Sequence, residues 1–102
     1  MPCSEKNIDD MYKELLGLVD SIKETHLKQL LQHFFVEDKA FAKEFQQHSA
    51  AKTIHHGFVG GLLEHSLSVA KMCDYYSTSY PIMNRDLLVT AALCHDIGKI
   101  YE

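Results

Sequence analysis

The chain lacks the features of a membrane or secreted protein. No run approaches the roughly 20 consecutive apolar residues that a transmembrane helix needs, and the first residues read MPCSEKNIDD, without the basic and apolar regions of a signal peptide. We therefore expect no membrane contact and a cytoplasmic location.

Cysteines are few and unpaired in the sequence. Cys3, Cys73 and Cys94 make an odd number, and none belongs to a C-x-x-C motif, which argues against a disulfide framework and against a cysteine zinc site. Cys73 and Cys94 fall in apolar helical patterns, where cysteine commonly serves as a small core residue. A catalytic thiol at Cys94 is the weaker interpretation, because most buried cysteines are inert.

Positively charged residues are fewer than negatively charged ones. The net charge of −4 excludes a globally basic surface for nucleic acid. Any such contact must be local, through residues such as Lys52, Lys71, Arg85 and Lys99.

Strand signals are missing as well, and helical spacing takes their place. No segment alternates with period two, and no Asn-Gly or Asp-Gly turn occurs. Apolar residues instead recur three and four positions apart, as on one face of a helix. The sequence predicts an all-α bundle of about five helices, over residues 8–22, 27–35, 37–47, 58–77 and 85–97.

The last helix has recognisable ends. Asn84 is a good N-cap residue, and Gly98 suits the left-handed position just past a helix. His95 and Asp96 then lie on the final turn, and Lys99 lies in the turn that follows.

Two histidines stand out on the predicted helices. His65 lies at one flank of the apolar stripe of the 58–77 helix, and alone it is most simply a core-edge histidine bonded to a backbone carbonyl. His95 shares a row with Leu88 and Ala91, which we expect to be the buried side of the last helix. Helices packed through these faces would bring His65 and His95 together.

Asp96 adds a carboxylate to this pair of imidazoles. It is turned by about 100° from His95, yet both side chains can reach one point near a helix end. His65, His95 and Asp96 would suit a divalent transition metal with open positions for water and substrate, whereas calcium prefers oxygen ligands alone.

Other residues around the 58–77 helix leave two interpretations open. Gly60 and Gly61 favour either close approach of a phosphate to the backbone N–H groups or tight packing against a neighbouring helix. His55 and His56 are solvent-exposed loop residues or substrate contacts. Lys99 is a solvated lysine or a phosphate-binding charge.

The segments LLEHSLSVA and AALCHDIGK, taken together, resemble the HD superfamily of metal-dependent phosphohydrolases. More closely, KTIHHGFVGGLLEHSLSVA and NRDLLVTAALCHDIGK are similar to the HD domain of YhaM-type 3′–5′ exoribonucleases. The likeness covers residues 24–102, which we expect to be the first part of an HD domain, cut after the His-Asp helix, with residues 1–23 as a lead-in helix.

The resemblance implies a site and a reaction. His65, His95 and Asp96 match the family's metal ligands, with manganese a common choice and iron, nickel, cobalt or magnesium as other choices. Asp96 would also act catalytically, and Lys99 and His56 would bind the phosphate-ester substrate. The implied reaction is hydrolysis of single-stranded RNA from its 3′ end.

Two other readings stay open. A phosphohydrolase acting on mononucleotides would carry the same motif. A catalytically silent helical module that binds a metal or nucleotide would belong to a different class. Under each of these interpretations, helix faces left uncovered by a missing half of the domain would favour a homo-oligomer.

Overall fold

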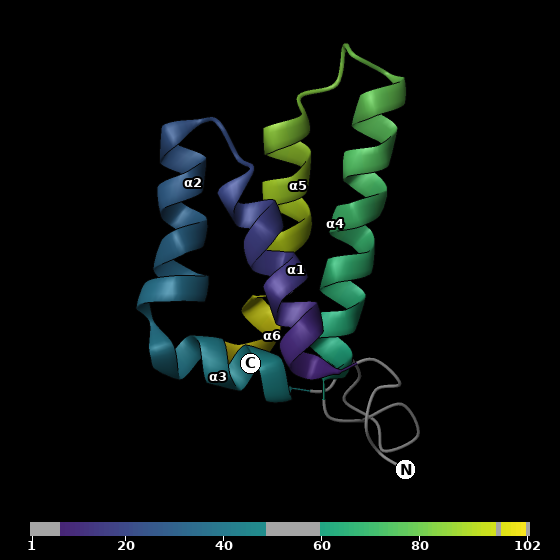
Figure 1. Ribbon diagram of the computed structural model, residues 1–102. Helices are drawn as coiled ribbons and strands as arrows, with labels where there is room; N and C mark the ends of the chain where they lie inside the picture. The colour runs from purple at the N-terminus through teal and green to yellow at the C-terminus, as the bar shows by residue number, and fades with distance from the viewer. Residues whose placement is uncertain (1–6, 49–59, 96, 102) are drawn as a thin grey trace.

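The computed structural model describes residues 7–48, 60–95 and 97–101, except for the side chains of Lys99 and Tyr101 (Figure 1). Every regular element in these residues is helical, so the predicted all-α fold of about five helices is confirmed. The elements are α1 (Ile8–Asp20), α2 (Thr25–Gln32), the π-helical turn η1 (His33–Glu37), α3 (Lys39–Gln47), α4 (Gly61–Ser79), α5 (Arg85–Cys94) and the short α6 (Gly98–Tyr101).

Side-chain caps fix where four of these helices begin. Asn7, Glu24, Asp38 and Asn84 each accept a hydrogen bond from a backbone N–H three residues further along the chain. Such caps satisfy backbone donors that have no partner within the helix. The predicted N-cap at Asn84 is confirmed, since its Oδ1 lies 3.1 Å from the Leu87 nitrogen.

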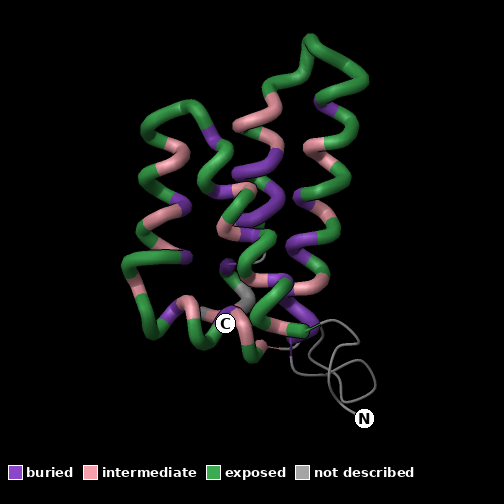
Figure 2. Tube along the Cα trace, in the orientation of Figure 1, coloured by how far each residue is buried: buried purple, intermediate pink, exposed green. Residues whose placement is uncertain are grey.

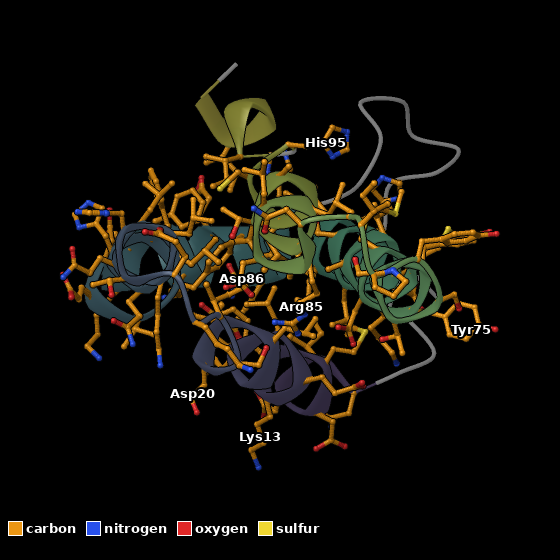
Figure 3. All side chains as sticks on the ribbon, turned by 90° about the horizontal axis from the view of Figure 1, so that it is seen from above. Lys13, Asp20, Tyr75, Arg85, Asp86 and His95 are labelled. Carbon is orange, nitrogen blue, oxygen red and sulfur yellow. The ribbon has the colours of Figure 1, made fainter. Side chains whose placement is uncertain are left out.

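The bundle is organised around an antiparallel pair, α4 and α5, which share the most extensive contact in the described fold (Figure 1). Helix α1 packs against α4 and α2, while α3 lies across the end where α4 begins and α5 ends. Seen from above, α1 and α6 lie on opposite sides of the bundle (Figure 3). Because α4 and α5 run antiparallel, the beginning of α4 and the end of α5 lie at the same end of the molecule.

The core follows from the inward faces of these helices (Figure 2). Burial of such side chains supplies the main stabilising free energy of a small domain. The largest fully buried side chains come from six of the helical elements and from the loop after α1: Met11, Leu15, Val19, Ile22, Leu31, Phe35, Phe45, Leu62, Leu63, Val89 and Leu93.

One irregularity departs from the predicted 27–35 helix. The Asp38 N–H donates to the His33 carbonyl over 2.9 Å, which closes a π-helical turn after α2. This turn buries Phe35 edge-on against Phe45, with ring centroids 5.0 Å apart, and the Tyr12 hydroxyl donates to the Phe35 carbonyl. Leu30 lies among the apolar residues of the predicted 27–35 helix, yet it is 44% exposed.

Among the described helices, none combines the length and apolarity required to span a bilayer.

Candidate metal centre

His65 and His95 meet at the shared end of α4 and α5. His65 lies in the second turn of α4, and His95 caps α5, where its N–H donates to the Ala91 carbonyl over 2.9 Å. The two ring centroids are 6.2 Å apart, and the ring planes are inclined by 51°. Figure 3 shows His95 directed outward from the end of α5.

Both rings are exposed, and this corrects the expectation for α5. The row of Leu88, Ala91 and His95 is not the buried side of the helix, because Ala91 and His95 are exposed. Burial falls instead on Val89, Thr90, Ala92 and Leu93. The histidines come together because the helices run antiparallel, which places both at one end, at the edge of the helix contact.

The end of α5 also differs from the prediction. The helix stops at Cys94, and Ile97 donates to the Cys94 carbonyl over 3.0 Å before α6 begins at Gly98. The expected left-handed conformation at Gly98 is wrong, since Gly60 is the described glycine with a positive φ. Ile97 is only 9% exposed, so packing of its side chain turns the chain back toward the core. Lys99 consequently lies in α6 and not in a turn.

The distance between the two imidazoles is close to the upper limit for two ligands of one metal ion. With metal–nitrogen bonds of about 2.1 Å, two imidazoles on one ion have ring centroids about 4.5–5.5 Å apart at tetrahedral or cis-octahedral angles and at most about 6.5 Å apart when they lie opposite each other. The observed 6.2 Å lies at the upper end of this range. Imidazole suits zinc, copper, iron and nickel, and a carboxylate adds affinity for manganese and magnesium.

The rest of the predicted site is only partly visible. Asp96 and His56 lie outside the described residues, as does His55, and the side chain of Lys99 is also outside them. Within the described part of the chain, no three His, Cys, Asp or Glu side chains gather closely enough to hold a metal ion. Asp96, the third ligand predicted from the sequence, is the neighbour of His95 in the chain.

The two glycines at the start of α4 have an explanation in conformation and packing. Gly60 has a φ of 88° and precedes the first residue of α4, a conformation that side chains disfavour. Gly60 and Gly61 are both buried. This fits the packing explanation for the pair.

Several other candidates from the sequence have structural partners. Arg85 contacts Asp74 and Ser21, and Lys71 contacts Glu14 over 3.0 Å, so both cations serve the fold. Burial raises the pKa of the Cys94 thiol. This disfavours the thiolate that a nucleophile requires.

Comparison with known proteins gives matches over the same region. Residues 62–102 match the HD domain family. The chain is 31% identical over 96 residues to the 3′–5′ exoribonuclease YhaM of Listeria innocua, covering 94% of this chain and 30% of that protein. It is 30% identical over 94 residues to the protein of that name from Bacillus velezensis, covering 92% of this chain and 29% of the relative.

The chain thus spans about 30% of the length of the curated relatives that it matches. No solved structure shows significant similarity to it.

Proposed function

We propose that the chain is part of a metal-dependent phosphohydrolase that cleaves RNA from its 3′ end, because residues 62–102 match the HD domain family. The observation that carries the proposal is the approach of His65 and His95, whose ring centroids are 6.2 Å apart. The choice of RNA rests on relatives that are named 3′–5′ exoribonucleases.

In this proposal His65, His95 and Asp96 hold a divalent metal ion, with manganese the first choice. When bound, such an ion lowers the pKa of a coordinated water and supplies the hydrolytic nucleophile. His65 and His95 offer their imidazole nitrogens from two different helices. The packing of α4 against α5 therefore sets the spacing of these two ligands.

The remaining roles are assigned by position in the motif. Asp96 would orient the attacking water, and Lys99 and His56 would bind the phosphate oxygens of the substrate. Placing cations where negative charge develops is the main electrostatic contribution to phosphoryl chemistry.

Metal binding is testable on this chain without any activity assay. Titration with manganese by calorimetry should show binding that His65→Ala and His95→Ala each abolish. His33→Ala is a matched control, because His33 is an exposed histidine on η1. Binding that survives in His95→Ala, or that falls equally in His33→Ala, would remove the pair from the metal centre.

The reaction is tested in the full-length protein. Asp96→Ala should abolish manganese-dependent hydrolysis, and retained activity would remove Asp96 from the mechanism. Phosphate release from mononucleotides, with single-stranded RNA left intact, would favour the nucleotide phosphohydrolase. A full-length protein that binds metal but hydrolyses neither substrate would be the silent module.

We further propose a cytoplasmic location and self-association. Seven large apolar residues between positions 72 and 87 are exposed: Met72, Tyr75, Tyr76, Tyr80, Ile82, Met83 and Leu87. Exposed apolar patches commonly mark contact sites. Sedimentation of the chain at micromolar concentration should show dimers or larger species, and a clean monomer would contradict this.

A further inference from the structure

A groove lies between α1 and the η1–α3 segment, away from the histidine pair. Its volume is about 330 Å³, and Tyr12, Leu16, Phe35, Val36 and Ala42 supply its apolar lining, with Lys39, Lys43 and Gln46 as the polar part. Figure 3 places α1 and His95 on opposite sides of the bundle. The groove is therefore separate from the candidate metal centre.

The apolar part of the groove is built by the π-helical turn. Phe35 is buried in the core while the next residue, Val36, is 47% exposed, so the turn presents an aliphatic side chain on the wall. The hydrogen bond from the Tyr12 hydroxyl to the Phe35 carbonyl ties α1 to this turn. The groove is thus formed before any partner arrives, which lowers the cost of binding.

The charged residues that line the groove are both positive. Lys39 and Lys43 are both exposed and lie four residues apart on α3, so their side chains are neighbours on one helical face. Neither has an ion pair among the described residues, whereas Lys28 and Lys71 are paired with Asp20 and Glu14. The two cations thus remain available to an anionic partner.

We propose that this groove binds an acidic amphipathic segment of a partner protein, with an apolar side chain between α1 and η1 and carboxylates on Lys39 and Lys43. A helix that lays its apolar face into a groove is a common mode of peptide recognition. The aromatic rings favour this partner over nucleic acid, because stacking of bases needs an exposed ring face. Phe35 is only 1% exposed, and the ring of Tyr12 is half-buried, with its hydroxyl donating to the Phe35 carbonyl.

The probe is a short fluorescent helical peptide with glutamates on one face and leucines on the other. Its binding to the chain is followed by fluorescence anisotropy, beside a scrambled peptide of the same composition and a fluorescent oligoadenylate. Lys39→Glu combined with Lys43→Glu should weaken peptide binding about tenfold or more, since it replaces attraction by repulsion. Lys13→Glu combined with Lys23→Glu makes the same change in net charge at two lysines that do not line the groove and should alter the affinity less than about twofold.

A second pair of variants tests the apolar contact. Val36→Ser should weaken binding of the peptide. Leu30→Ser, at an exposed position on α2, should leave the affinity unchanged. Circular dichroism verifies that each variant is folded. If the Lys39/Lys43 and the Lys13/Lys23 double variants weakened peptide binding equally, the binding would reflect only long-range electrostatic attraction, and the proposal would be overturned.

Three other results would also overturn it. These are equal binding of the scrambled peptide, no saturable binding of either peptide, and preferential binding of oligoadenylate that the Lys39 and Lys43 substitutions remove. The last result would make the groove a nucleic-acid surface. None of these measurements depends on the histidine pair, so the outcome is separate from that of the proposed function.

Discussion

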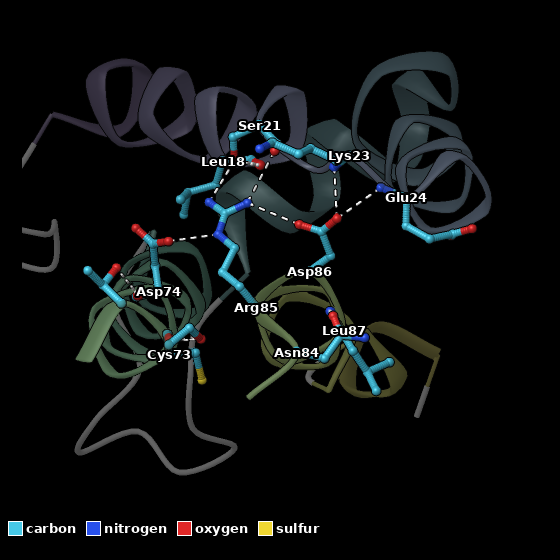
Figure 4. Close-up of polar contacts among 12 residues, drawn as sticks. Leu18, Ser21, Lys23, Glu24, Cys73, Asp74, Asn84, Arg85, Asp86 and Leu87 are labelled. Carbon is cyan, nitrogen blue, oxygen red and sulfur yellow. Dashed lines mark hydrogen bonds and ion pairs between the residues drawn. The ribbon is translucent and has the colours of Figure 1, made fainter. Parts of the chain in front are cut away.

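Arg85 Nε lies 2.7 Å from Asp74 Oδ1, and this ion pair joins the start of α5 to the C-terminal half of α4. The same guanidinium donates to the Ser21 hydroxyl over 2.7 Å and to the Ser21 carbonyl over 3.2 Å (Figure 4). Three segments that are distant in sequence are therefore fastened to one side chain. Charge-assisted hydrogen bonds of this kind are stronger than neutral ones.

Arg85→Ala should lower the free energy of unfolding by about 1–3 kcal/mol, because several hydrogen bonds to a charged group are lost from a partly buried position. Arg85→Lys should recover only part of this, since lysine lacks the planar fork. Urea unfolding measures both changes. Lys71→Ala breaks the exposed pair with Glu14 and should cost less than about 1 kcal/mol; an equal cost for the two alanine variants would contradict the argument.

Asp86 makes the stability of the fold depend on pH. Burial acts to raise the pKa of its carboxyl, but backbone hydrogen bonds from Glu24 and Lys23 and contact with Arg85 outweigh it and hold the pKa below its ordinary value. Each of the two backbone nitrogens lies 2.9 Å from Asp86 Oδ2. A carboxyl whose pKa is lower in the folded state stabilises the fold above its unfolded pKa of about 3.9.

The stabilisation that the Asp86 carboxylate provides is lost as the pH falls through the lowered pKa of this group. The free energy of unfolding should therefore decline as the pH drops from about 5 toward 3, and Asp86→Asn should flatten that decline. Urea titrations across this pH range measure the slope. An unchanged slope in Asp86→Asn would assign the acid sensitivity to other carboxyls, such as Glu24, whose pKa is lowered by the Leu27 N–H.

Cys94 should react slowly with thiol reagents in the folded chain. Burial raises the pKa of its thiol, and the thiolate is the reactive form. In a chain with Cys3→Ser and Cys73→Ser, iodoacetamide labelling at neutral pH should be slow and should accelerate in urea. Labelling as fast in the folded chain as in urea would show that the thiol is accessible and ionised.

Alanine at two glycines should have opposite effects on stability. Gly17 lies inside α1 with open space around the position of an added Cβ, so Gly17→Ala should stabilise the fold by up to about 1 kcal/mol. Gly60 has a φ of 88°, and Gly60→Ala should destabilise it by about 1–2 kcal/mol. Thermal unfolding of both variants tests this, and shifts of the same sign would contradict the assignment.

Local features of the sequence were sufficient for the helical class and for one helix end. Three- and four-residue spacing of apolar side chains predicted the helices, and Asn84 predicted the start of α5, because capping depends on atoms within one turn. The spacing did not reveal the π-helical turn at His33–Glu37. That turn depends on Phe35 and Tyr12, which are 23 residues apart in sequence.

The face of α5 and the end of the same helix were decided by tertiary packing. The sequence predicted the row of Leu88, Ala91 and His95 as the inward face of α5, but packing against α4 buries Val89 instead. Likewise Ile97, packed into the core, set the chain direction after Cys94, where Gly98 alone indicated a left-handed end. The sequence determined that this is a helical chain and that residues 62–102 match the HD domain family. Only the antiparallel packing of α4 and α5 placed His65 and His95 6.2 Å apart, because the distance between two helices depends on contacts that no local spacing encodes.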